Sequence, residues 1–256
     1  MGIETAIFLI IAAGFAGFVD AMAGGGGLIQ LPALLIGLSE KPIPMILGTN
    51  KVISIFGTSS AAINYFRRVK PDLKLTSYMA IPALIGSAAG ARLASSFPTS
   101  VFRPLIIFLL ISVAIYTWRK PELGMNENLR FTSRKRHQIV MALGLTIGFY
   151  DGIFGPGTGS FLMLILVASL GYAFITASAI AKVVNVSTNV GAIMIFGLHG
   201  AIIWQLGLML GAANVTGAVI GSRLAIRGGS VLVRKVFLIV TVALILKVGI
   251  DTFASF

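Results

Sequence analysis

The chain has 256 residues, of which 57% are hydrophobic and only 11% are charged, and its mean hydropathy is +0.97. So few polar side chains cannot cover a soluble domain of this length, which indicates an integral membrane protein. The 20 Lys and Arg residues outnumber the 8 Asp and Glu residues and lie mostly in short segments between apolar stretches, which favours cytoplasmic loops over a nucleic-acid partner. Because cysteine is absent, disulfides and thiolate metal sites are excluded.

The first apolar segment, residues 3–38, is longer than one membrane crossing and is interrupted by glycines at 24–27. It begins without a basic leader or an A-x-A cleavage site, so we expect it to be retained. A second overlong segment, residues 139–172, is interrupted at 155–159. The stretches that can each cross once are 46–66, 75–95, 101–118, 174–196, 202–225 and 231–250.

The long polar segment 119–137 divides the chain near its middle. We expect it to be a basic cytoplasmic linker between a first transmembrane repeat, residues 1–118, and a second, residues 138–256.

The two halves repeat in a single register. Asp20 and Asp151, each in a Gly-Phe-x-Asp motif, lie 131 residues apart. The same offset pairs Gly24 with Gly155, Gly26 with Gly157, Lys51 with Lys182, Gly86 with Gly217, Gly90 with Gly221, Arg92 with Arg223, and Arg103 with Arg234. Agreement at so many special residues indicates a duplicated unit.

Loop charge predicts that the second unit is inverted. The loop 67–74 is basic, whereas its counterpart around His199 carries no Lys or Arg, and basic loops stay in the cytoplasm. Inversion requires an odd number of crossings in each unit. The expected fold is therefore an all-α integral membrane protein of two inverted-topology repeats, each a broken-helix hairpin plus three transmembrane helices, with both termini outside. If the broken segments cross fully instead, the neutral turn lies inside.

The glycine runs predict a binding site for an anion. Inverted repeats with interrupted helices are common in secondary transporters, whose substrate site lies near the midplane. Each run would end one half-helix and expose the free N–H groups of the next, which in the first half would begin at Leu28, and such N-termini bind anions. Close helix packing is the alternative role of the glycines. The candidate residues are Gly25, Gly26, Gly27, Gly157, Thr158 and Gly159.

Lys51 and Lys182 are expected deep in the membrane. If the helix around Lys51 begins near Ile43, this lysine lies about 12 Å along it. An ammonium group at that depth is costly without a partner or water, so it is a functional candidate. Polar residues that precede the lysines or share their helical face are Thr49, Asn50, Ser54 and Thr58 in the first half and Asn185 and Asn189 in the second. With the half-helix ends, they predict a cage for a compact, doubly charged oxoanion.

Asp20 and Asp151 are the acids in apolar surroundings, and they admit more than one role. They could form structural ion pairs with the lysines or cap the second half-helices. They could also take up a proton, which would free a lysine for substrate and couple transport to a proton gradient.

No Walker motif, metal-spaced cluster or nucleophile–base arrangement occurs in the sequence. We therefore expect no enzymatic activity, no cofactor and no metal.

The motifs GFVDAMAGGGGLIQLPALL and LGTNK, followed in the second half by GFYDGIFGPGTGSF and AKVVNVSTNVGAI, resemble those of the sulfite exporter TauE/SafE family, also called the TSUP permeases. The resemblance covers essentially the whole chain. It implies a multi-pass permease of a bacterial or archaeal inner membrane for sulfite, thiosulfate or organosulfonates, driven by an ion gradient such as H⁺ or Na⁺.

The leading functional hypothesis is thus a secondary transporter of a small anion, with membrane lipids around it and no nucleic-acid partner. The alternatives are an anion channel of the same architecture and, more distantly, a carrier of a cation bound by Asp20 and Asp151, which nearby lysines would repel. The sequence leaves the anion, the direction of transport, the coupling ion and the oligomeric state open.

Overall fold

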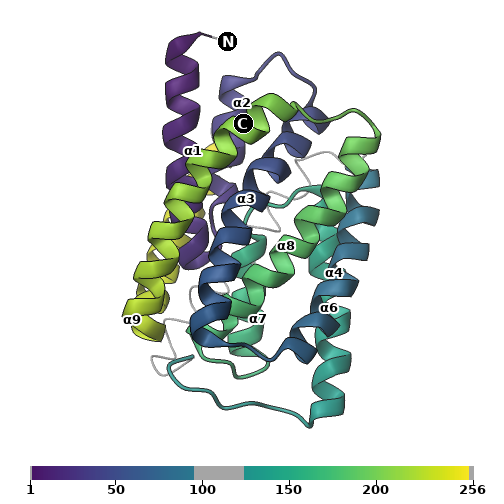
Figure 1. The fold of residues 1–256 in the computed structure, drawn as a ribbon, viewed down its shortest axis with the longest axis vertical. Coiled ribbons are helices and arrows are strands. Elements are labelled where there is room, and N and C mark those ends of the chain that lie inside the picture. The colour runs from purple at the N-terminus through teal and green to yellow at the C-terminus, as the bar shows by residue number, and fades with distance from the viewer. Residues whose placement is uncertain (1, 95–123, 254–256) are drawn as a thin grey trace.

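The computed structural model describes residues 2–94 and 124–253, and the regular elements in these ranges are all helices (Figure 1). The all-α prediction is therefore confirmed for this part of the chain. The expected span 101–118, with Arg103, and the first residues of the expected linker lie outside the described residues. The helices are α1 (Ile3–Ala23), α2 (Gly27–Gly37), α3 (Ile43–Val69), α4 (Leu73–Leu93), α6 (Ser133–Ile153), α7 (Thr158–Ala168), α8 (Phe174–Leu198) and α9 (Trp204–Phe253).

The helix boundaries follow the apolar stretches closely. The predicted breaks fall between α1 and α2 and between α6 and α7. The stretches 202–225 and 231–250 are the two arms of α9, which are joined at Gly229 by a non-helical kink (φ 59°, ψ −161°). Helix α6 begins at Ser133, so it includes the last residues of the segment expected to be the linker.

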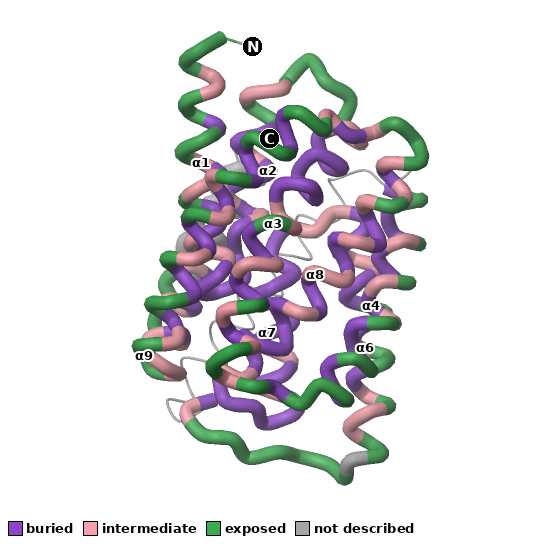
Figure 2. The backbone as a smooth tube through the Cα atoms, in the orientation of Figure 1, coloured by how far each residue is buried: buried purple, intermediate pink, exposed green. Residues whose placement is uncertain are grey.

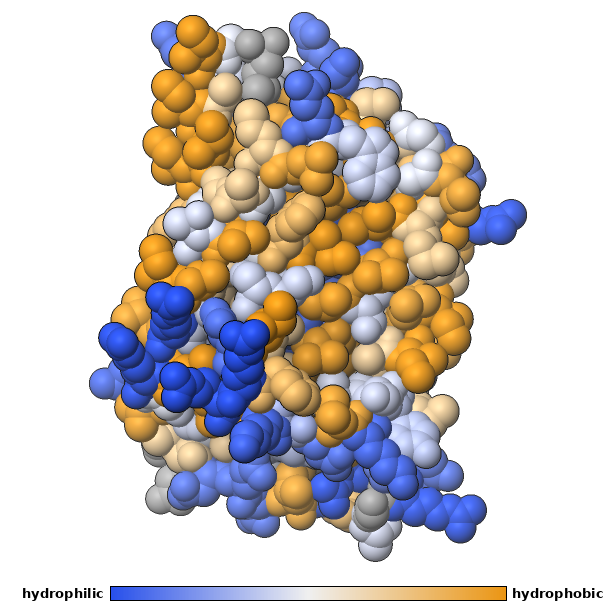
Figure 3. Space-filling view, viewed as in Figure 1, coloured by the Kyte–Doolittle hydropathy of each residue, from blue (hydrophilic) through white to orange (hydrophobic). Residues whose placement is uncertain are grey.

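Two of the described helices, α1 and α8, are long and apolar enough to cross a membrane by length and composition. The 11 residues of α2 and of α7 rise only about 16 Å, roughly half of the hydrocarbon thickness. One face of α1 leaves Ile7, Ile11 and Phe15 exposed, and apolar side chains dominate the view in Figure 3. Such a surface is suited to contact with lipid.

The helices before and after each break form two hairpins. Gly37, at the end of α2, lies against Leu9 of α1, and the backbone N–H of Arg130, just before α6, donates to the carbonyl of Leu170, just after α7. The α1–α2 hairpin lies at the end of the molecule where α1 begins and α9 ends (Figure 1). Helix α6 starts at the opposite end, where α3 is joined to α4.

Two apolar clusters surround the hairpins, and Figure 2 shows buried backbone running through the interior between them. One includes Leu34 of α2 with Ile53 and Phe196, and the other includes Leu166 of α7 with Tyr65. Along α3, Ser54 and Thr58 fall between the residues of the two clusters, and along α8 Asn185 and Asn189 do the same. The fold therefore holds a polar layer between two apolar ones.

Glycines bring the backbones of α4 and α6, and of α1 and α9, into direct contact. A Cβ atom at Gly86 would lie 2.2 Å from the carbonyl oxygen of Leu145, and one at Gly217 would lie 1.8 Å from that of Gly14. Both members of the second contact are offset by 131 residues from those of the first. The two halves thus use equivalent packing contacts, as expected of small residues between membrane helices.

The two helix breaks also touch each other. Gly24 has φ +77°, and a Cβ atom there would lie 2.2 Å from the carbonyl carbon of Gly159. The backbone N–H of Ser160 donates to the carbonyl oxygen of Gly24 (3.2 Å), and its hydroxyl donates to that of Ala23 (2.7 Å). Only glycine combines this left-handed backbone with so close an approach.

Replacing Gly24 by alanine is expected to destabilise the protein by roughly 3 kcal/mol, because the left-handed backbone disfavours a side chain and the methyl group clashes with Gly159. Gly197→Ala in α8 is the matched control, since a methyl group there meets its nearest atom at 3.6 Å. Thermal unfolding in detergent measures both. Equal unfolding midpoints for the two variants would contradict the contact between the breaks.

Candidate functional site

A small cavity of about 30 Å³ lies where the two helix breaks meet α3 and α8. A space of this size holds about one or two water molecules. It is lined by Asp20, Gly24, Gly27, Asn50, Lys51, Ser54, Thr58, Asp151, Gly155, Gly157, Thr158, Gly159, Asn185 and Asn189. The structure therefore brings most of the predicted site residues of both halves to one place.

Lys51 of α3 pairs with Asp151 of α6. Its Nζ lies 2.7 Å from the carboxylate Oδ2 and donates to the main-chain carbonyl oxygen of the same residue (2.6 Å). Asp151 is in the last turn of α6, where carbonyl groups carry partial negative charge. The ammonium group thus compensates both a carboxylate and the end of a helix.

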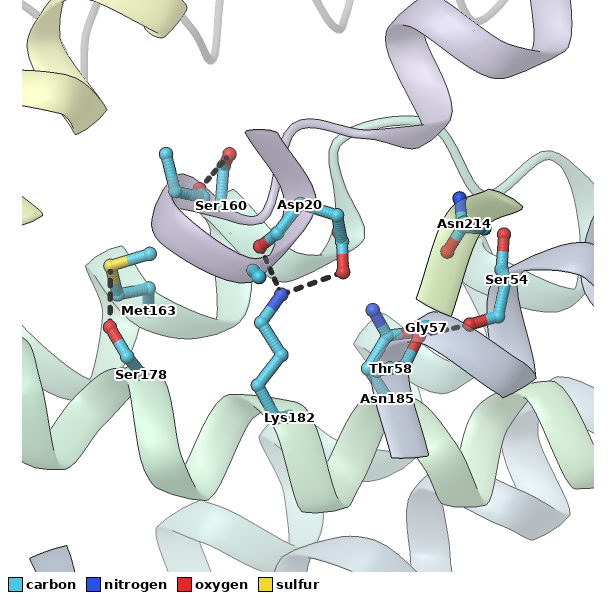
Figure 4. A network of polar contacts seen from close by, with 12 residues as sticks. Asp20, Ser54, Gly57, Thr58, Ser160, Met163, Ser178, Lys182, Asn185 and Asn214 are labelled. Atoms are coloured by element: carbon cyan, nitrogen blue, oxygen red, sulfur yellow. Dashed lines mark hydrogen bonds and ion pairs between the residues drawn. The ribbon is translucent and has the colours of Figure 1, made fainter. Parts of the chain in front are cut away.

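Lys182 of α8 makes the equivalent pair with Asp20 of α1 (Figure 4). Its Nζ lies 2.8 Å from Oδ2 of Asp20 and also donates to the main-chain carbonyl oxygen of this residue. Lys182 is the counterpart of Lys51 at the 131-residue offset, and Asp151 is the counterpart of Asp20. Each pair therefore joins a lysine from one half to an aspartate from the other half.

The charges of the four residues cancel, so the lysines do not present free ammonium groups to the cavity. The side chains of Lys51 and Asp151 are 4% and 3% exposed, and that of Lys182 is 1% exposed. Asp20 differs, because its side chain is 18% exposed. Of the two carboxylates, that of Asp20 is therefore the more accessible from the cavity.

Hydroxyl and amide groups form the remaining polar wall. Ser54 and Thr58 lie on α3 at helical spacing, and Asn185 and Asn189 follow the same pattern on α8. The Nδ2 group of Asn189 donates to Oδ1 of Asn185 (3.3 Å). Oδ1 of Asn50 is buried and has no hydrogen-bond partner among the described residues, so it is available to water or to the O–H group of a ligand.

The free backbone N–H groups at the first break precede Leu28, the residue at which the sequence predicts that they begin. The N–H of Leu28 donates to the carbonyl of Gly25 (3.1 Å), so it is not a free donor. Among the described residues, no hydrogen bond is recorded from the backbone N–H groups of Gly26, Gly27, Gly157 or Gly159. These groups, at the starts of α2 and α7, supply the unsatisfied donors of the two half-helices.

Four predicted site residues do not line the cavity: Thr49, Gly25, Gly26 and Lys182. The Thr49 hydroxyl donates to the carbonyl of Met45 (2.7 Å) and accepts from the backbone N–H of Ile203 (2.9 Å), so it holds the start of α9. Gly26 faces the backbone of Ala16. Lys182 binds the carboxylate of Asp20, and Asp20 lines the cavity.

Asn214 of α9 is a central residue that the sequence reasoning missed. Its Nδ2 donates to the carbonyl of Ala13 (2.9 Å) and to Oε1 of Gln30 (2.8 Å), and so it ties α1, α2 and α9 together beside the break. Its place in Figure 4 is close to Ser54. An amide in the middle of an apolar membrane helix was the available signal.

Comparison with known proteins decides the family. Residues 9–248 match the family described as Sulfite exporter TauE/SafE. The chain belongs to this family. No solved structure matches the TauE/SafE chain.

The TauE/SafE chain is similar to curated relatives along nearly its whole length. It is 40% identical to a "Probable membrane transporter protein ORF9" of Sinorhizobium sp over 245 residues, which cover 95% of this chain and 92% of the relative. It is 34% identical to a "Probable membrane transporter protein" of Haemophilus influenzae over 255 residues (98% and 97%) and to YfcA of Escherichia coli K12, which has the same description, over 247 residues (95% and 89%). These relatives support a membrane location for the chain.

Lys51→Met is expected to lower the free energy of unfolding by about 3–5 kcal/mol, because it leaves Asp151 buried without a counter-ion. Adding Asp151→Asn is expected to restore much of this loss, since neither buried charge then remains. Unfolding in detergent measures both variants.

The matched control combines Lys51→Met with Asp20→Asn, two residues that belong to different pairs. It leaves Asp151 and Lys182 both unpaired, so it should be less stable than either single variant. Equal stability of the two double variants would show that the crossed pairing is wrong.

Proposed function

We propose that this TauE/SafE protein is a secondary transporter that carries a small oxoanion, of the sulfur oxoanion or organosulfonate class, across the inner membrane. The observation that carries the proposal is the central cavity, where two half-helix N-termini from opposite hairpins meet two crossed lysine–aspartate pairs. Interrupted helices that meet near the midplane form the substrate sites of many secondary transporters.

The proposed architecture is a pair of inverted repeats, each a re-entrant hairpin followed by three spans, with residues 101–118 as one span of the first repeat. Two observations support it. The hairpins α1–α2 and α6–α7 start from opposite ends of the molecule, and α2 and α7 are too short to cross. The basic end, with the linker 119–137, lies in the cytoplasm, and the end with both termini lies outside.

Protonation of Asp20 is the proposed coupling step. At the cavity, two ammonium groups balance two carboxylates, so an incoming anion meets no net positive charge. A proton on Asp20 removes one negative charge and leaves the ammonium of Lys182 to pair with the cargo. Backbone N–H groups and the polar side chains of α3 and α8 then complete the hydrogen bonds of the oxoanion.

The structure corresponds in this proposal to a state closed to cargo. A cavity of about 30 Å³ is too small for an oxoanion of four or more heavy atoms. Cargo therefore enters when the contact between Gly24 and Gly159 opens. So small a central space supports a carrier over a channel, because a channel conducts through a continuous path wide enough for the ion.

In liposomes, the purified protein is expected to accumulate sulfite, thiosulfate or a sulfonate with saturable kinetics when a pH gradient is imposed, and to discriminate against chloride. Lys51→Met should reduce uptake about tenfold or more, because it leaves Asp151 as an uncompensated negative charge in the cavity wall, which repels the anion. Lys41→Met, at an exposed lysine between α2 and α3, is the matched control and should leave uptake unchanged.

Ser54→Ala keeps the test decisive if Lys51→Met does not fold. It removes one cavity hydroxyl and should raise the half-saturation concentration about fivefold. Flux that rises linearly with concentration and never runs uphill would identify a channel instead. Uptake by both cavity variants that equals the parent's would place the site elsewhere.

Asp20→Asn is expected to abolish the dependence of accumulation on the pH gradient while downhill uptake continues, because the amide cannot take up the proton. Asp151→Asn is the comparison, and it should retain this dependence, since Asp20 is the more exposed of the two carboxylates. Uptake is measured with and without an imposed pH gradient. An Asp20→Asn protein that still responds to the gradient as the parent does would remove Asp20 from the coupling step.

A further inference from the structure

A second hollow, of about 630 Å³, opens between α3 and α9 away from the central cavity. The described residues that line it are Asn64, Arg67, Arg68, Arg223, Ile226 and Arg227. Arg67 and Arg68 are in the last turn of α3, and the other two arginines precede the kink of α9 at Gly229. Nδ2 of Asn64 donates to Oγ of Ser222 (2.9 Å), so the two helix walls are joined at the hollow.

The four guanidinium groups have no carboxylate partner among the described residues, where the recorded ion pairs are the two in the central cavity. Asp72, the acid that follows Arg68 most closely in the chain, accepts the N–H groups of Lys74 and Leu75 as a helix cap. Four like charges around one hollow repel one another unless an anion lies between them. The hollow is therefore complementary to a multiply charged anion.

Apolar side chains continue from the arginines toward the membrane interior. Ile63 is one turn before Arg67 on α3, and Ile220 and Leu224 are one turn before Arg223 and Arg227 on α9, and all three apolar side chains are largely exposed. Figure 3 shows a group of strongly hydrophilic side chains at the lower part of this face, with apolar surface above it. A free anion would contact only the charged part of this surface, whereas a phospholipid would contact both parts.

We infer that this hollow binds an anionic membrane phospholipid, with its phosphate between the four arginines and its acyl chains along the exposed apolar side chains of α3 and α9. The planar guanidinium fork matches phosphate geometry. Basic pockets between transmembrane helices on the cytoplasmic side bind lipid headgroups with phosphate in this way, and a headgroup with two phosphates, such as that of cardiolipin, compensates more of the charge. This site is separate from the cavity of the proposed function.

Lipid binding by the detergent-solubilised full chain, followed as thermal stabilisation during titration, tests the site. Phosphatidylglycerol and cardiolipin should stabilise the parent, and phosphatidylethanolamine and free inorganic phosphate should do so much less. Arg67→Gln combined with Arg223→Gln should weaken binding of the anionic lipids about 30-fold, which corresponds to about 1 kcal/mol for each basic residue removed. Arg134→Gln with Lys135→Gln, two exposed basic residues of α6 outside the hollow, is the control that removes the same charge.

The control variant should bind the anionic lipids within about threefold of the parent. If both double variants weaken lipid binding equally, the effect is one of overall charge and the site is wrong. If inorganic phosphate stabilises the parent as well as the lipids do, the hollow is a site for a soluble anion and the lipid assignment fails. The unfolding midpoints without lipid show whether each variant is folded, and Arg68→Gln with Arg227→Gln replaces the first pair if that pair does not fold.

Discussion

The burial of two ammonium–carboxylate pairs at the contact between the two halves is the constraint on which the centre of this protein depends. A charge in a low-dielectric interior is tolerated only with a partner of opposite sign, and breaking such a pair is far more costly than forming it is favourable. Because each pair takes its lysine from one half and its aspartate from the other, neither half can shift at the centre without exposing charge. The pairs therefore keep the two hairpins together.

This arrangement also explains why the helices break where they do. The carbonyl of Asp151 has no recorded backbone donor among the described residues, whereas that of Asp20 accepts the backbone N–H of Gly24 (2.8 Å) as well as the ammonium group. Ending α1 and α6 soon after the aspartates gives each ammonium group a main-chain carbonyl as a second acceptor. The glycines after these ends let the chain reverse and let the two breaks meet.

The two halves are equivalent in their packing but not in their chemistry. Ser160 hydrogen-bonds from the second break to the backbone of the first, whereas its counterpart 131 residues earlier, Ile29, has no hydroxyl and donates its N–H to Gly26. The two aspartates also differ, because the side chain of Asp20 is 18% exposed and that of Asp151 is 3% exposed. The two faces of the cavity are therefore chemically different although the backbone contacts around them repeat.

The periodicity and composition of the chain determined the helical class, the positions of the helices and their breaks, and the register of the repeat, because these follow from local hydropathy and from residues with special backbone chemistry. The same signals selected most of the residues that line the cavity, since a polar side chain in an apolar membrane helix is stable only in contact with other polar groups or water. Sequence spacing could not show that Thr49 turns away to hold α9, that Leu28 is already satisfied, or that Asn214 supports the break, because each depends on a neighbour far along the chain. Only the tertiary structure decided that each lysine neutralises the aspartate of the opposite half and that the space left between them is small, since charge compensation and cavity size depend on distances between helices that no single segment encodes.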